Sequence, residues 1–289
     1  MSGPLRARPI VIIGAGRSGT NILRDVLTGI PGFGTWPCDE INYIWRHGNV
    51  RHPDDELTAD QVTPRIRSYI RGAFDHIAER GRLDHVVEKT CANSLRVGFV
   101  DAVLPEARFI NIVRDGRDVV ASAKLRWTAP LDLPYLAKKA RWVPLTDLPW
   151  YASRYLWNRA YRLFSREKRL AFWGPRFAGL DDALARYELE EVCALQWKRC
   201  VDRSDADLGR IDPERLHAIS YETFARDPEH ELSRLADFLG VDIPDAQRNQ
   251  LAASVSPRSV GKWRRDLDVD TVKKIEVIAG ETLRTHGYF

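Results

Sequence analysis

The chain has 289 residues, 44% of them hydrophobic and 29% charged, and its formal net charge is +4 at pH 7. These values are ordinary for a soluble globular protein that buries one substantial core. No apolar run approaches the roughly 20 residues that cross a bilayer. The N-terminus shows no signal-peptide pattern either, so membrane-spanning and secreted classes are disfavoured and we expect a cytoplasmic location.

The four cysteines Cys38, Cys91, Cys193 and Cys200 form no CxxC pair and no Cys/His cluster with the spacing of a metal site. Cys193 and Cys200 lie about two turns apart in a helical stretch, which is too far for a disulfide within one helix. We therefore expect reduced thiols and no structural zinc.

The first predicted strand, Pro9–Ile13, leads into a glycine-rich turn, Gly14–Gly19, and a helix that opens at Thr20 or Asn21. Glycine lets the backbone turn tightly, so that several N–H groups and the positive end of the helix dipole converge on one point. Such a point binds a phosphate-like group, and Arg17 adds a full positive charge. The stretch therefore predicts an anion-binding loop.

One alternative for this loop is a dinucleotide site. The spacing Gly14-x-Gly16-x-x-Gly19 fits that fingerprint, and Asp39 stands where a ribose-binding acid is expected. However, residues 33–38 contain turn formers and a proline where the second strand should run, so the acid would lack its scaffold.

A second alternative is a Walker loop, because Gly14 and Gly19 also have its spacing. Thr20 and Asn21 stand where that loop has lysine and serine or threonine, so two parts of ATP chemistry are missing. The loop cation here is Arg17 instead. A purely structural glycine turn is the remaining alternative.

An irregular stretch after the first helix carries Asp39, Glu40 and His47. Loops in this position of an open parallel sheet overhang the ligand crevice, so an acid here could reach a substrate. A solvated loop acid is the alternative. The next segment, Asp60–Arg80, has apolar residues at helix spacing and is expected to be a covering helix.

A short apolar strand that begins at His85 delivers Glu88 and Lys89 at its carboxyl end. A charged pair at this edge of a parallel sheet is well placed to act on a ligand, although a surface ion pair is the alternative. The predicted helix Arg96–Leu104 then leads to another apolar strand, Arg108–Val113.

Arg114 follows that strand, and a tight turn and a helix come next, with Ser122 two turns along. An arginine can fork onto a phosphate while a serine donates from the helix. This arrangement predicts a second anion pocket beside the first. Two pockets on neighbouring strands suit a ligand with two separated anionic groups.

Residues 125–177 combine basic and aromatic side chains. Between Lys138 and Arg176, ten Lys and Arg stand against Asp147 and Glu167, a local charge of +8. This local excess favours a specific anionic partner or surface over general nucleic-acid binding. The region also holds five of the nine tryptophans: Trp127, Trp142, Trp150, Trp157 and Trp173.

Three interpretations of this region stay open. Trp150, Trp157, Tyr161 and Phe164 recur at helical spacing, which usually indicates a face packed on the core. Aromatic walls with cationic rims would instead suit a lid over a large amphipathic or anionic acceptor. The third interpretation is an interfacial helix, within 138–176, that touches anionic lipid.

The remaining chain is mostly helical. We expect a helix over Asp181–Arg203, a strand over Leu216–Tyr221, and a helix over Pro228–Leu239 that ends at Gly240. A basic loop with glycine and serine, Ser254–Asp266, precedes a terminal helix.

Three motifs together resemble the sulfotransferases that use 3'-phosphoadenosine 5'-phosphosulfate (PAPS). GAGRSGTNIL, VEKT and PEARFINIVRDGRDVVAS occur in the order and rough spacing of that family, particularly of its bacterial and tyrosylprotein-like branches. The resemblance implies an α/β fold of three layers, with helices flanking a central, mostly parallel sheet like that of the P-loop NTPases. It also fits a single domain over residues 1–289, with a helical, Trp- and Arg-rich insertion at about 125–180.

The resemblance also implies which residues bind the nucleotide. They are Arg17, Ser18, Gly19 and Thr20, with Asn21 beside them, in the 5'-phosphosulfate loop; Arg114 and Ser122 at the 3'-phosphate; Tyr221 near the adenine; and Ser259, Gly261 and Lys262 in a C-terminal loop that closes over the 3'-phosphate. Trp197 is a weaker candidate for stacking on the base, and core packing is its alternative.

The implied reaction transfers a sulfuryl group from PAPS to an acceptor hydroxyl, with an amine as the alternative, by in-line attack on sulfur. It releases 3'-phosphoadenosine 5'-phosphate (PAP) and needs no metal. Lys89 resembles the lysine that steadies the transferring group, and Arg17 assists it. Glu40 is the first candidate for the base, because a glutamate after the first helix has that part in the tyrosylprotein-like branch. Asp39, His47 and Glu88 are the alternatives.

The chain departs from the family pattern at two positions. Cys91 follows VEKT where bacterial relatives tend to have proline, and Lys89 lacks the adjacent histidine base of the animal cytosolic enzymes. The second departure shifts the base toward a carboxylate.

Two other function classes stay open. A P-loop nucleotide kinase would share the fold and the first loop but bind ATP with magnesium, and a nucleotide-binding protein without chemistry would hold PAP and turn nothing over. The acceptor stays open among carbohydrates, lipids, peptides and phenolic small molecules. We expect no nucleic-acid partner.

Overall fold

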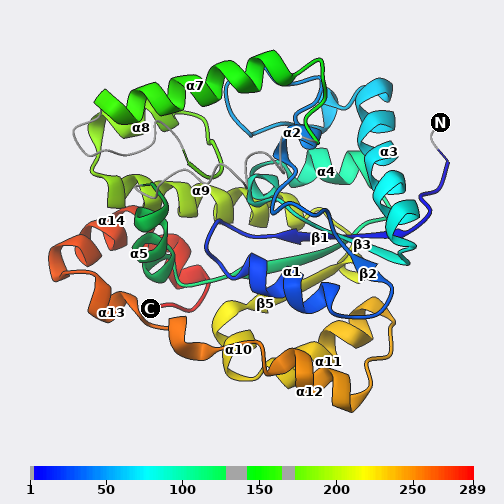
Figure 1. Cartoon of the computed structure of the whole chain (residues 1–289). Helices are drawn as coiled ribbons and strands as arrows, with labels where there is room; N and C mark the ends of the chain where they lie inside the picture. The colour runs from blue at the N-terminus through cyan, green and yellow to red at the C-terminus, as the bar shows by residue number, and fades with distance from the viewer. Residues whose placement is uncertain (1–2, 128–141, 165–172) are drawn as a thin grey trace.

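The computed structural model describes residues 3–127, 142–164 and 173–289 of the chain (Figure 1). In these residues the strands form one sheet in the order β2-β3-β1-β4-β5, and every pairing is parallel. The strands are β1 (Arg8–Ile13), β2 (Phe33–Gly34), β3 (His85–Lys89), β4 (Arg108–Val113) and β5 (Leu216–Ser220). The predicted α/β fold with a central parallel sheet is confirmed.

Helices cover both faces of this sheet and give three layers (Figure 1). In β1, Ile10 and Ile12 pack into the core of one face, and Val11 and Ile13 into that of the other, as the strand period of two requires. The first face is covered by α1 (Thr20–Thr28), α10 (Tyr221–Arg226), α11 (Pro228–Leu239) and α12 (Asp245–Ala252). The second is covered by α2 (Asn42–Trp45), α3 (Pro64–Gly81) and α4 (Val97–Val103).

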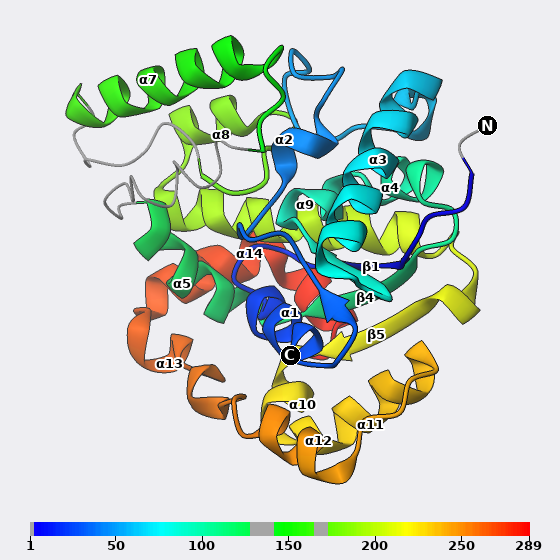
Figure 2. The same cartoon turned by 45° about the vertical axis from the view of Figure 1, so that its right-hand side comes forward.

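A third apolar cluster begins where β1 and β4 end, at Ala15 and Val113. It joins α5 (Gly116–Trp127), α8 (Leu180–Arg186), α9 (Leu189–Leu208) and α14 (Val269–Thr285). Both views place α7 (Leu148–Phe164) beyond α8 and α9, at the rim of the molecule (Figures 1 and 2). The short helices are α13 (Trp263–Asp266), η1 (Ala59–Gln61), η2 (Cys91–Leu95), η3 (Pro213–Arg215) and η4 (Pro257–Ser259).

The strand order determines where the site forms. Because β1 lies between β3 and β4, the carboxyl ends of these three strands meet at one edge of the sheet. The glycine-rich loop, Lys89 and Arg114 follow or end these strands and therefore lie side by side, at the edge where open α/β sheets bind ligands.

Two helix predictions are wrong in detail. The helix expected over Asp181–Arg203 is two helices, because Glu188 begins α9 and forms a reciprocal cap with Glu191. The helix expected from residue 60 begins at Pro64, where the Thr63 side chain accepts from the backbone and caps α3. In both places a local capping contact sets the boundary.

None of the described helices is long and apolar enough to cross a membrane. All four cysteines are buried free thiols.

Candidate active site

The glycine-rich loop joins β1 to α1 at the carboxyl edge of the sheet. Gly19 has φ 90° and Arg17 has φ 74°, in the left-handed region that glycine favours. Contacts hold Arg17 in this conformation: its Nε donates to Ser122 Oγ at 2.9 Å, and its carbonyl accepts from Arg114 Nη1 at 3.1 Å. The two predicted anion pockets therefore adjoin each other through Arg17.

The interior of the loop has an unused donor. Ser18 is 0% exposed, and its hydroxyl has no hydrogen-bond partner in the described part of the chain. Burying a hydroxyl without a partner costs free energy, which a bound anion would offset. Thr20 Oγ1 lies 3.6 Å from Cys91 Sγ, while Asn21 is exposed on the first turn of α1.

Arg114, predicted to line the second anion pocket, contacts several neighbouring segments. It is 7% exposed, it donates to the carbonyl of Ser259, and its guanidinium lies 4.5 Å from the centre of the Tyr221 ring. Its Nε has no partner among the residues that the structure describes. Arg114 thus holds neighbouring segments together and keeps one donor available for an anion.

Tyr221 and Trp197 are buried beside these pockets and pack against glycines. A Cβ added to Gly19 would lie 2.3 Å from the Tyr221 ring, and one added to Gly116 would lie 2.7 Å from the Trp197 ring. Trp197 is 1% exposed and donates Nε1–H to the carbonyl of Arg114 at 3.1 Å. Trp197 therefore belongs to the core and is not available to stack on a base.

The C-terminal loop is fastened to α5 by Asp118. Its carboxylate, 2% exposed, accepts from the backbone N–H of Gly261 at 2.7 Å and of Trp263 at 2.8 Å. Gly261 has φ 71°, and Lys262 Nζ lies 3.8 Å from Asp266. Together with the bond from Arg114 to Ser259, these contacts bring the loop next to Arg114.

Lys89 lies in a cluster with two loop acids. Its Nζ is 2.8 Å from Asp39 Oδ1 and 3.3 Å from Glu40 Oε1, and its side chain is 1% exposed. Burial alone lowers the pKa of Lys89, but the carboxylates of Glu40 and Asp39 outweigh burial and hold the pKa above its ordinary value. Lys89 is therefore a permanent cation.

The two acids of this cluster differ in their suitability as a base. Asp39 also pairs with Arg24. Burial raises the pKa of Asp39, but Lys89 and Arg24 lower it below its ordinary value, so Asp39 is a weak proton acceptor. The Glu40 side chain is 26% exposed, and its Oε1 also accepts from the backbone of Cys91 at 3.4 Å. Glu40 combines access with a fixed position.

The other two candidate bases lie apart from this cluster. Glu88 is 0% exposed and accepts from Asn93 Nδ2 at 2.8 Å, and burial raises the pKa of Glu88 to about 7. Because the strand alternates, Glu88 faces away from Lys89 and is buried from any acceptor. His47 Nδ1 lies 2.8 Å from Asp147 Oδ2, and its ring packs on Tyr69.

The aromatic region divides into packed and exposed parts. Trp150 and Trp157, on α7, are 36% and 65% exposed, so the interpretation that they pack on the core is wrong. Trp173 lies beside the glycine-rich loop, 3.5 Å from the place of a Cβ on Gly16. The side chains of Tyr161 and Phe164 and most of the basic cluster lie outside the described residues. The lid and the lipid contact stay predictions.

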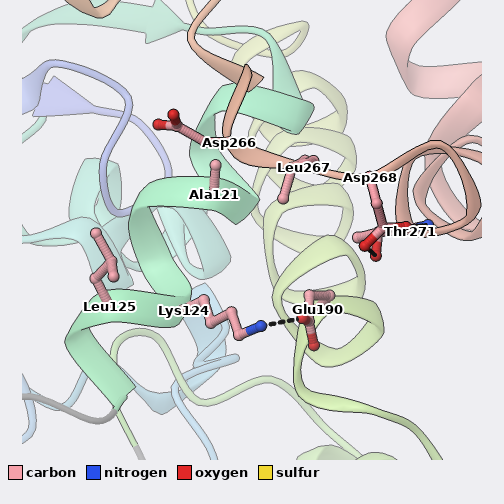
Figure 3. A pocket seen from close by; sticks show the side chains of 8 residues that line it. All are labelled: Ala121, Lys124, Leu125, Glu190, Asp266, Leu267, Asp268 and Thr271. Atoms are coloured by element: carbon pink, nitrogen blue, oxygen red, sulfur yellow. Dashed lines mark hydrogen bonds and ion pairs between the residues drawn. The ribbon is translucent and has the colours of Figure 1, made fainter. Parts of the chain in front are cut away.

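A separate hollow of about 300 Å³ lies between α5, the start of α9 and the turn into α14 (Figure 3). Lys124 contacts Glu190 across it (Figure 3). Its lining is Ala121, Lys124, Leu125, Glu190, Asp266, Leu267, Asp268 and Thr271, which includes none of the predicted site residues. Within residues 3–127, 142–164 and 173–289, no group of three or more His, Cys, Asp or Glu is arranged to hold a metal ion.

Three residues near the glycine-rich loop were not identified by the sequence analysis: Asp118, Arg126 and Arg24. Asp118 and Arg126 lie one helical turn after Arg114 and Ser122, and this i,i+4 spacing is the signal that could have found them. Burial, then the charges of Arg126 and Arg114, lower the pKa of Arg17. Three cations thus gather at the loop. Arg24 gave no comparable signal, because its contact with Asp39 joins residues 15 apart in sequence.

A sequence model of the sulfotransferase family matches residues 9–164 and 158–245 of the chain. The search of curated proteins found no match to the chain.

Several solved structures are similar to the chain. The sulfotransferase domain from the curacin biosynthetic pathway shares 15% identity, with 96% of this chain and 98% of that chain covered and a TM-score of 0.54. Sulfotransferase STF9 from Mycobacterium avium shares 14%, with 98% and 77% covered and a TM-score of 0.53. Mouse sulfotransferase SULT7A1, complexed with PAP, shares 14%, with 97% and 86% covered and a TM-score of 0.51. At these identities the likeness concerns the fold.

Proposed function

Because the chain belongs to the sulfotransferase family, we propose that it transfers a sulfuryl group from PAPS to an acceptor hydroxyl and releases PAP. One observation carries this proposal: the two predicted anion pockets and the acid–lysine pair, Glu40 with Lys89, lie next to one another at one edge of the sheet. Arg17 contacts both Ser122 and Arg114, and β3 delivers Lys89 next to the strand that leads into the loop.

The residues present fit the two anionic ends of this nucleotide. Ser18 Oγ and Arg114 Nε are buried polar atoms without partners in the described residues, and both need an acceptor of hydrogen bonds. Ser18 and the loop amides would hold the 5'-phosphosulfate, and Arg114, Ser122 and the loop at Ser259 would hold the 3'-phosphate. Only glycine is tolerated at residue 19, because Tyr221 fills the space of a side chain.

When bound, PAPS would supply the sulfuryl group. The task of the protein is to stabilise the negative charge that grows on the departing nucleotide. Lys89 is a buried permanent cation, and Arg17 carries a second charge at the loop. In a poorly hydrated site such charges act more strongly than in water.

We assign the base to Glu40. It would accept the proton of the acceptor hydroxyl, while its contact with Lys89 keeps it in place. Because of this contact, the proposed proton acceptor, Glu40, lies next to Lys89, the cation that would stabilise the transition state. The acceptor class stays open. The Trp173 ring beside the glycine-rich loop and the positive charges of Arg17, Arg114 and Arg126 support an acceptor with an aromatic or anionic part.

Calorimetry with PAP, ATP with magnesium, and NAD tests the nucleotide assignment. We expect PAP to bind most tightly, and Arg17→Ala and Arg114→Ala to weaken it. Preference for ATP with magnesium would favour a nucleotide kinase, although Thr20, where a Walker loop has lysine, argues against that class.

Turnover is tested separately, with labelled PAPS and a panel of carbohydrate, lipid, peptide and phenolic acceptors. Label that moves to one acceptor class supports the proposal. PAP binding with no transfer to any class would favour the nucleotide-binding protein without chemistry.

A further inference from the structure

A buried polar network lies next to the pair of Glu40 and Lys89, on the face of the sheet that α2 covers. Its centre is Arg96, whose side chain is 0% exposed. Arg96 Nε donates to Asn93 Oδ1 at 2.8 Å, and its Nη2 donates to Asn42 Oδ1 at 2.5 Å. Asn93 in turn donates to Glu88 Oε2 at 2.8 Å. The chain of contacts runs from a strand to a loop that are distant in sequence.

The two ends of this network adjoin the proposed catalytic groups. Glu88 directly precedes Lys89 on β3, and Asn42 begins α2, two residues after Glu40. Within the same turn, the N–H of Ile41 donates to Thr90 Oγ1 at 3.1 Å. The network therefore links the strand that carries the cation to the turn that carries the base.

Asp55 extends the network through contacts with Asn42, Arg46 and Arg96. Its carboxylate accepts from Arg46 Nη1 at 2.9 Å and from Asn42 Nδ2 at 3.3 Å, and it lies 3.5 Å from Arg96 Nη1. It also pairs through its backbone N–H with the carbonyl of Arg176 at 2.7 Å. Asn42 is thus held through both atoms of its amide, which leaves it one orientation.

We propose that Arg96 is a positioning residue for sulfuryl transfer: through Asn42 it holds the turn that keeps Glu40 beside Lys89. This inference rests on the proposed function. A buried arginine is an expensive way to fill a core, because apolar residues of similar volume are often as stabilising. The planar guanidinium fork fixes the relative position of two segments, because Nε and Nη2 donate at the same time to Asn93 and Asn42.

The first test compares Arg96→Lys with Arg71→Lys. Arg71 is a matched control: it is 6% exposed and donates to the carbonyls of Val103 and Gly3 and to Glu106, far from Glu40 in the network of contacts. Lysine donates from a single nitrogen with rotatable hydrogens, so it cannot hold two partners in the fixed plane of the guanidinium fork. A small displacement of a catalytic group can cost about 100-fold in rate.

We expect Arg96→Lys to lower kcat by at least about tenfold while the Kd for PAP stays within about twofold, and Arg71→Lys to change neither. Asn42→Ala should reproduce the loss of kcat with Arg96 still in place. In the Glu40→Gln background, Arg96→Lys should add less than about twofold, because a residue that acts through Glu40 has nothing left to position. The inference would be overturned if Arg96→Lys and Arg71→Lys had the same kcat. It would also be overturned if Arg96→Lys lowered kcat by the same factor in the Glu40→Gln background as in the wild type.

A second measurement does not depend on turnover. Amide hydrogen exchange of residues 39–45 reports local opening of the turn. Exchange there should be faster in Arg96→Lys and Asn42→Ala than in the wild type and in Arg71→Lys. If the turn exchanges as slowly in all four proteins, the inference fails even where the enzyme is active. If the wild type neither binds PAP nor transfers the label, it is the proposed function that fails.

Discussion

The sharpest test of the nucleotide site is Arg114→Ala. In the structure Arg114 links the carbonyls of Arg17 and Ser259 and packs on Tyr221, and its Nε has no partner among the described residues. Hydrogen bonds to charged groups contribute about 1.5–3 kcal/mol. Since about 1.4 kcal/mol is a factor of ten in Kd, the variant should bind PAP about 10- to 150-fold more weakly.

The variant should still fold. Asp118, the acidic neighbour of Arg114, keeps two backbone donors, so removing the guanidinium leaves no carboxylate without a partner. The expected loss of stability is about 1–2 kcal/mol, from two lost bonds to neutral carbonyls. Arg114→Lys should fall between the wild type and alanine for PAP affinity, because it keeps the charge without the fork.

Arg108→Ala is the matched control. Arg108 lies at the other end of β4, donates to a backbone carbonyl of Phe238 and packs over that aromatic ring, 5.4 Å from its centre. It should therefore lose similar stability without changing PAP affinity. Titration calorimetry with PAP measures the affinities, and thermal unfolding measures the folded fraction. A folded Arg114→Ala that binds PAP as tightly as Arg108→Ala would refute the assignment of the second pocket.

Three further predictions concern other parts of the site. Glu40→Gln should lower kcat by about 10²- to 10⁴-fold and leave the Kd for PAP unchanged; wild-type turnover would remove Glu40 from the role of base. Asp118→Asn should free the loop at Gly261 and weaken PAP binding by roughly tenfold, because an amide cannot accept both backbone bonds well; limited proteolysis within residues 257–266 would detect the release, and equal protection would contradict it. Burial raises the pKa of Glu88 from 4.5 to about 7, so the folded state holds this proton more tightly than the unfolded state, and the Glu88 contribution to stability is lost as pH rises from 4.5 to about 7. The wild type should therefore lose stability relative to Glu88→Gln across that window in urea unfolding, and a constant difference would show that Glu88 does not titrate there.

Local sequence predicted the two segments that adjoin at the glycine-rich loop. A strand, a glycine turn and a helix follow one another within residues 9–27, and both Arg114 and Ser122 lie within one strand–turn–helix unit. Such units form from short-range preferences, so their chemistry can be inferred before the fold is known. The parallel sheet followed from the same units. Helix boundaries followed less well, because caps such as that of Glu188 depend on one side chain.

The sequence by itself thus determined the family and the sheet, and it placed the glycine-rich loop and Arg114 with Ser122 in two strand–turn–helix units, since these depend on neighbouring residues. Only the tertiary structure decided which groups meet. The strand order places Lys89 beside the glycine loop, and the fold brings Asp118 to the C-terminal loop. It also gives Glu88 and Lys89, adjacent in the chain and both buried, different partners: Asn93 for Glu88, and the loop acids for Lys89. The physical reason is that contact and desolvation arise from segments 50 or more residues apart, as Lys89 and Asp39 are, and no local pattern records them.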